Sequence, residues 1–126
     1  ILEQADCGML LDVNNIYVNA MNHDCYKPTE FLDQLDLDRV VQVHIAGHLE
    51  DYKSWISGAS IKILDTHGQA ICDEVYEILS ELLKRTSVNA ILLERDSNFP
   101  DFAELIEELK AIGQIVRNST RDTQLL

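Results

Sequence analysis

Three short apolar runs constrain the fold of this 126-residue chain more than any other feature. The runs span residues 9–12, 40–44 and 90–94, and they end at Asp12, His44 and Glu94. Apolar runs of this length between helical segments are typical of buried parallel strands. The carboxyl ends of parallel strands gather at one edge of a sheet. We therefore expect two carboxylates and an imidazole to meet at that edge.

The composition is that of a globular protein, and it excludes several kinds of partner. A hydrophobic content of 46% argues against wholesale disorder, and a formal net charge of −12 argues against nucleic acid or an anionic membrane as partner. No run approaches the roughly 20 apolar residues of a membrane span, and we identify no signal peptide. The three cysteines form no CxxC pair, so we expect no disulfide framework and a cytoplasmic protein.

Helical segments alternate with the three predicted strands. Residues 13–27 are expected to form a polar loop, and a short helix is expected to begin at Pro28. A long connection over residues 46–71, with a short strand near residues 61–64, precedes a helix over residues 73–86. The last helix begins near Pro100, and its buried face is expected to include Phe102, Leu105, Ile106, Leu109, Ile112 and Val116. This order predicts an α/β fold built from right-handed parallel βα units.

The segment after the first predicted strand carries three polar candidates for a site. Asp12 ends the strand, and a carboxylate at that position needs solvent, a partner or a cation. An Asp after a strand is also a common turn-former or helix cap. Asn14 and Asn15 commonly form turns as well, although the amide oxygen of Asn15 could reach a cation held by Asp12.

The remaining candidates follow the second and third strands and the connection between them. His44 and His48 flank a short Ile-Ala-Gly segment, and Asp65 and His67 are two residues apart. In an extended backbone, residues two apart project to the same side and can share one cation. Each candidate has an ordinary alternative. His44 can be a satisfied core histidine, the Asp65/His67 spacing occurs by chance, and Glu94 can form a local ion pair with its neighbours.

Mixed imidazole and carboxylate ligands suit iron, manganese or zinc, whereas calcium and magnesium prefer sites made only of oxygen. No cysteine stands at a strand end, which argues against a structural zinc site. His23 lies in a context without other ligands and is expected at the surface.

Four ordered strings of residues resemble the multinuclear non-haem iron-dependent oxidative enzymes, a family that includes the enzyme of methanobactin biosynthesis. The strings are Leu10-Leu11-Asp12-Val13-Asn14-Asn15, Val43-His44-Ile45-Ala46-Gly47-His48, Asp65-Thr66-His67-Gly68 and Leu93-Glu94-Arg95-Asp96. The match extends from Gly8 to about Ile112, which makes it specific.

The resemblance implies a (β/α)₈ barrel similar to xylose isomerase and endonuclease IV. Residues 1–117 would supply the last three βα units of this barrel, and residues 118–126 a flexible tail. The intact enzyme would bind two or three iron ions, with zinc or manganese as alternatives. It would use dioxygen to modify residues, above all cysteine, of ribosomally made peptides, often with a partner protein that presents the peptide.

The resemblance also implies roles for individual residues. By motif position, the expected metal ligands are Asp12, His44, Asp65, His67 and Glu94. Asn14, Asn15 and His48 are expected to be further ligands or to support the ligands. No catalytic residue is assigned apart from these.

The chain departs from the family in one respect: the histidines and glutamate that complete the metal site on the first five strands have no counterpart here. We therefore expect a piece of a longer protein, inactive alone and prone to self-association through its open strand edges. Two other functions stay open. One is a metal-dependent hydrolase or isomerase on the same barrel, and the other is a non-catalytic barrel piece that binds a partner.

Overall fold

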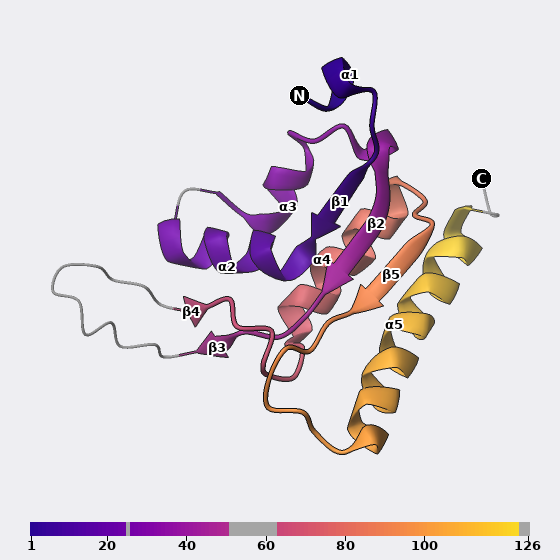
Figure 1. The fold of residues 1–126 in the computed structure, drawn as a ribbon. Coiled ribbons are helices and arrows are strands. Elements are labelled where there is room, and N and C mark those ends of the chain that lie inside the picture. Colours follow the sequence, from indigo (N-terminus) through magenta and orange to yellow (C-terminus); the bar gives the residue numbers. More distant parts are fainter. Residues whose placement is uncertain (25, 51–62, 124–126) are drawn as a thin grey trace, which may run out of the picture.

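Three parallel strands form the centre of the protein. The computed structural model describes residues 1–24, 26–50 and 63–123. The strands are β1 (Met9–Asp12), β2 (Val40–Ile45) and β5 (Ala90–Leu93), in the sheet order β1-β2-β5 (Figure 1). Asp12 pairs with His44, and His44 pairs with Leu92, so the three strands end level with one another. The predicted α/β fold with parallel βα units is confirmed.

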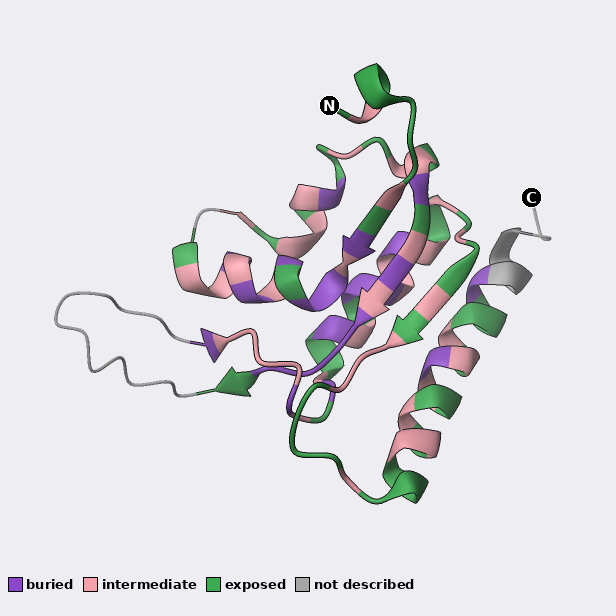
Figure 2. Cartoon of the chain, viewed as in Figure 1, coloured by how far each residue is buried: buried purple, intermediate pink, exposed green. Residues whose placement is uncertain are grey.

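Helices connect the strands and supply the buried layer. They are α1 (Leu2–Ala5), α2 (Val13–His23), α3 (Pro28–Leu32), the short 3₁₀ helix η1 (Leu37–Arg39), α4 (Asp73–Arg85) and α5 (Phe102–Thr123). α4 lies behind the sheet in Figure 1, and its predicted apolar stripe is buried there through Val75, Ile78, Leu79 and Leu82. These side chains share one core with Leu11, Val43 and Ile45 of the sheet. Figure 2 shows buried segments on the strands and on the helices behind them.

Two sequence predictions about the helices were wrong. Residues 13–23 form α2 rather than a polar loop, because Val13, Ile16 and Ala20 recur at helical spacing and are buried. The last helix continues through Thr123, so residues 118–123 of the expected tail are helical, and residues 124–126 lie outside the described part.

The buried face of α5 is narrower than its apolar pattern indicates. Ile112 is buried, but Phe102, Leu109 and Val116 are exposed. α5 packs against α4, and Figure 1 shows it running beside the edge strand β5.

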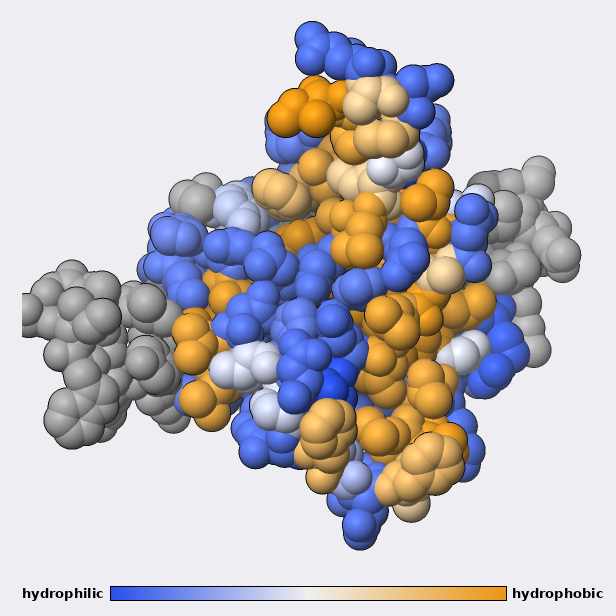
Figure 3. All heavy atoms as spheres, in the orientation of Figure 1, coloured by the Kyte–Doolittle hydropathy of each residue, from blue (hydrophilic) through white to orange (hydrophobic). Residues whose placement is uncertain are grey.

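Within the described residues, helices cover one face of the sheet and leave the other face open. Leu10, Gln42 and Leu92 are on the opposite face, which they share with Asp12 and His44 because side chains alternate along a strand. Leu10 is 51% exposed and Leu92 is 45% exposed. Figure 3 shows apolar side chains reaching the surface on this side. Parallel sheets are normally buried on both faces, so an apolar face of this kind is normally covered by other parts of a protein.

The long connection between β2 and α4 contains two short strands. They are β3 (Leu49–Glu50) and β4 (Ile63–Leu64), which pair in antiparallel fashion. The short strand expected near residues 61–64 is present at Ile63–Leu64. Residues 51–62 lie outside the described part. Within that part, no helix is both long and apolar enough to span a membrane.

A buried ion pair attaches α5 to the segment that follows β5 and to the segment that precedes α4. The Nη2 of Arg95 lies 3.2 and 3.0 Å from the two carboxylate oxygens of Glu108, and the backbone N–H of Ile71 donates to the same carboxylate at 2.9 Å. The two charged side chains are only 8% and 13% exposed. Burial, and then the charge of Glu108, raise the pKa of nearby Tyr76 to about 12.

Replacing Glu108 with alanine should therefore destabilise the protein strongly, because Arg95 would be left buried without a carboxylate. We expect a loss of about 3 kcal/mol in the free energy of unfolding, measured by urea denaturation of the full-length protein. The neighbouring Glu107→Ala is the matched control. Glu107 pairs with Lys110 in solvent, so its loss should cost less than about 1 kcal/mol. Equal effects of the two substitutions would contradict this account.

Candidate metal centre

The predicted convergence of polar side chains at the strand ends is present. Asp12 is the last residue of β1, His44 lies opposite it in β2, and Glu94 follows β5 directly. The backbone N–H of Glu94 donates to the carbonyl of Ile45 at 2.9 Å and so continues the pairing of β2 with β5. Asp12 also caps α2 by accepting a hydrogen bond from the backbone N–H of Asn15 at 2.9 Å. The helix-cap interpretation of Asp12 is confirmed, and its role as a metal ligand stays a prediction.

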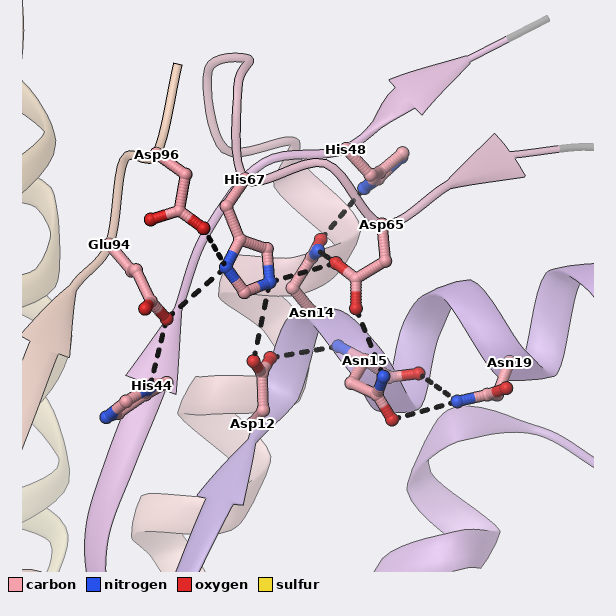
Figure 4. Close-up of polar contacts among 10 residues, drawn as sticks. All are labelled: Asp12, Asn14, Asn15, Asn19, His44, His48, Asp65, His67, Glu94 and Asp96. Carbon is pink, nitrogen blue, oxygen red and sulfur yellow. Dashed lines mark hydrogen bonds and ion pairs between the residues drawn. The ribbon is translucent and has the colours of Figure 1, made fainter. Parts of the chain in front are cut away.

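The imidazole of His67 lies in the middle of this group, between carboxylates on both sides (Figure 4). Its Nε2 is 3.0 Å from Asp65 Oδ1 and 3.5 Å from Asp12 Oδ2. Its Nδ1 is 3.3 Å from Glu94 Oε2 and 3.6 Å from Asp96 Oδ2. Four carboxylates around one partly buried imidazole repel one another, and a cation in their midst would relieve that repulsion.

The backbone holds His67 in an uncommon conformation. Its φ is 49°, in the left-handed region that residues other than glycine rarely adopt. The carbonyl of His67 accepts a hydrogen bond from the N–H of Asp96 at 2.8 Å. A Cβ on the next residue, Gly68, would lie 2.4 Å from Ser97 Oγ. The loop that carries His67 is therefore fixed against the loop that follows β5. Non-glycine residues in such conformations cluster at functional sites.

His44 lies at the side of the cluster and contacts it through Glu94. Its Nδ1 is 2.9 Å from Glu94 Oε2, and its Nε2 is 2.9 Å from the side-chain nitrogen of Gln42. Sequence reasoning did not identify Gln42. The signal was available, because residues two apart in a strand share a face. The predicted local ion pair between Glu94 and Arg95 is not the one formed, since Arg95 pairs with Glu108.

Two amide side chains of α2 hold the carboxylate of Asp65. Asn14 donates to Asp65 Oδ1, and Asn15 donates to Asp65 Oδ2 at 3.1 Å. The Nδ1 of His48 lies 2.9 Å from the side-chain amide oxygen of Asn14, and burial lowers the pKa of His48. His48 therefore contacts the carboxylate cluster through Asn14. His23 is exposed, as expected.

Three of the clustered side chains have donor atoms close enough together to hold one metal ion. Asp12, His67 and Glu94 each offer one atom, and these atoms all lie within 4.8 Å of one another. Burial raises the pKa of the Asp12 carboxyl, which is the cost of keeping a carboxylate here without a cation. Two carboxylates and an imidazole form a donor set that suits iron, manganese or zinc. The residues present therefore fit a transition-metal ion.

Fold and site together define an α/β protein with a candidate carboxylate–imidazole metal centre at the carboxyl ends of parallel strands. The chain belongs to the RiPP precursor modification enzyme family MbnB/TglH/ChrH, whose family model matches residues 1–117. The family resemblance predicted from the four sequence strings is thereby confirmed.

Several relatives from bacteria match most of the chain. It is 41% identical to a UPF0276 protein of Haemophilus influenzae over 91% of the chain and 43% of that protein. It is 38% identical to a UPF0276 protein of Pasteurella multocida over 98% of the chain and 46% of that protein. A UPF0276 protein of Neisseria meningitidis serogroup C is 44% identical over 90% of the chain and 38% of that protein. The chain spans less than half the length of these relatives.

Gly47, between His44 and His48, allows the loop that carries Asp65 and His67 to approach β2. A Cβ on Gly47 would lie 2.1 Å from the carbonyl oxygen of Gln69 and 2.3 Å from that of Ala70. Backbone atoms at such distances would have to move. Glycine is therefore required at this position by the close approach of two segments.

Gly47→Ala should lower the free energy of unfolding by about 1–3 kcal/mol, because the added methyl group overpacks against backbone. The control is Gly113→Ala in α5, where the new Cβ would meet only the end of the Arg117 side chain at 3.3 Å. That substitution should raise stability by up to about 1 kcal/mol through helix propensity. Chemical denaturation of the two variants gives both values. A neutral Gly47→Ala would show that the loop does not pack as described.

Proposed function

We propose that this chain is part of an iron-dependent oxidase that uses dioxygen to modify residues, cysteine above all, of ribosomally made peptides. Membership of a family described as RiPP precursor modification enzymes supports a precursor peptide as substrate. The observation that carries the metal assignment is the donor group of Asp12, His67 and Glu94 around one point. A partner protein that presents the peptide belongs to the same proposal.

In this proposal, the ligands are Asp12, His44, Asp65, His67 and Glu94, with Asn14, Asn15 and His48 as further ligands or supports. When bound, iron supplies a redox centre that can activate dioxygen for oxidation of the peptide. The protein residues hold the donor atoms in place before any ion arrives. Asp12 is fixed by its cap on α2, and Glu94 by its hydrogen bond to His44. Held in place in this way, these residues would bind an ion with little rearrangement.

The donor set also limits which ions fit. Carboxylates neutralise the charge of a divalent ion, and a single imidazole in the described triad adds a nitrogen donor. The net charge of −12 raises the local concentration of cations around the protein. These features favour a divalent transition metal, and zinc and manganese are the competitors of iron.

The test uses the full-length protein and a candidate cysteine-containing precursor peptide. Iron-loaded protein should change the mass of the peptide in air and leave it unchanged without dioxygen, as read by mass spectrometry. Asp12→Ala and His67→Ala should abolish the change because each removes a donor. His23→Ala, which removes an exposed histidine of α2, is the control and should keep full activity. Modification by protein that holds only zinc, or without dioxygen, would sink the oxidase proposal.

We further propose that the three βα units form the carboxyl-terminal part of a (β/α)₈ barrel, corresponding to residues 1–117. The support is the sheet itself, whose face bearing Leu10, Leu92 and the site residues is not covered by any described helix. The strands β1 and β5 each pair on one side only within the described residues. Strands contributed by the rest of a longer protein would pair with these edges and cover this face. Without them, we expect the isolated chain to self-associate.

Leu92→Asp distinguishes a covered face from an open one. In the full-length protein, we expect this substitution to cost about 3 kcal/mol or more, because it would bury an unpaired charge. Gln114→Asp, on the exposed side of α5, should change stability by less than about 0.5 kcal/mol. Urea denaturation measures both. If the full-length protein tolerates Leu92→Asp as well as Gln114→Asp, the barrel placement is wrong.

A further inference from the structure

Helix α2 carries four asparagines that bond to each other or to the segment at residues 63–65. They are Asn14, Asn15, Asn19 and Asn22, which we call the asparagine face. Asn22 pairs with both backbone groups of Ile63, donating to its carbonyl at 2.8 Å and accepting from its N–H at 3.0 Å. Asn19 donates to the side chain of Asn15 at 2.8 Å, and Asn15 in turn donates to Asp65. The segment that ends at Asp65 is therefore attached to α2 by side chains (Figure 4).

Asn14 is the most buried of the four asparagines. It is 0% exposed, and its side-chain nitrogen donates to Asp65 Oδ1. A carboxylate can only accept, so the amide nitrogen must face Asp65 and the amide oxygen must face His48. The Nδ1 of His48, 2.9 Å away, must then carry the hydrogen that it donates to this oxygen. The order of donors and acceptors is fixed along His48, Asn14 and Asp65.

His48 is itself held in one place. Its side chain is 2% exposed, and its ring packs on Tyr17 with centroids 5.1 Å apart. Tyr17 also belongs to α2, so His48 is attached to the same helix as Asn14. A buried ring with few rotamers and a buried amide provide a rigid support for a carboxylate.

We propose that His48 and Asn14 are positioning residues that set the orientation of Asp65 toward His67 and so define one side of the metal centre. This inference rests on the proposed function, because it takes the cluster around His67 to hold a metal ion. Asp65 Oδ1 accepts from Asn14 and also lies 3.0 Å from His67 Nε2. Losing the Asn14 amide would remove the contact that holds Oδ1 toward the imidazole and leave the Asn15 contact at Oδ2.

The test compares two substitutions at His48 in the full-length protein, with cobalt(II) as the probe ion. His48→Phe keeps a ring against Tyr17 but removes the N–H that holds Asn14. His48→Asn places an amide N–H near the position of Nδ1. We expect His48→Phe to shift the visible absorption bands of bound cobalt and to weaken cobalt binding about tenfold or more. His48→Asn should restore most of both properties.

Two further variants make the test decisive. His23→Phe is the matched control, the same change at a histidine of α2, and should leave the cobalt spectrum unchanged because His23 is exposed. If His48→Phe does not fold, Asn14→Ser carries the same prediction, since it removes the amide and keeps a polar group. A lower unfolding midpoint with unchanged cobalt affinity and spectrum would mean a structural role only, and would overturn the proposal.

A separate measurement distinguishes failure of this inference from failure of the proposed function. If wild-type protein binds no cobalt at this cluster, the metal assignment fails and NMR decides the positioning claim. The side-chain amide hydrogens of Asn14 should then exchange slowly with solvent in wild type and quickly in His48→Phe. Equally slow or equally fast exchange in the two proteins would overturn the proposal.

Discussion

The repulsion among the carboxylates around His67 is the interaction on which the rest of the site depends. Asp12, Asp65, Glu94 and Asp96 all approach the two nitrogens of His67, at distances of 3.0–3.6 Å. Such a group is costly unless a cation balances it. The fold nevertheless holds the group together. His67 has an uncommon backbone conformation, Asp12 caps α2, and side-chain hydrogen bonds and a buried ion pair surround the cluster. The unfavourable repulsion is explained if the cluster binds a cation.

Each carboxylate is held by a different device, and the devices come from different parts of the chain. Asp12 is fixed by the start of α2, and Glu94 by His44 across two neighbouring strands. The segment carrying Asp65 is attached to the asparagine face, and Gly47 lets it lie against the end of β2. A site assembled this way is rigid on the described side. Its other side is the sheet face that no described helix covers.

Much of this could be predicted from the sequence because strand periodicity and strand ends are local signals. The runs ending at Asp12, His44 and Glu94 gave the strands, their parallel order and the edge where the site lies. Residues 13–23 were misinterpreted as a loop, because asparagines such as Asn14 and Asn15 favour turns and are unfavourable inside helices. Their side chains bond to residues far along the chain, and no local pattern contains that information. The exposed Phe102 and Leu109 were likewise assigned to a buried face by periodicity alone.

The central claim is that the cluster around His67 binds a transition-metal ion in the intact protein. Anomalous diffraction at the iron edge, from crystals of the full-length protein grown with ferrous iron, tests this most directly. The account predicts an anomalous peak within bonding distance of Asp12, His67 and Glu94. An iron peak only elsewhere, or none with His67 still among its carboxylates, would contradict it.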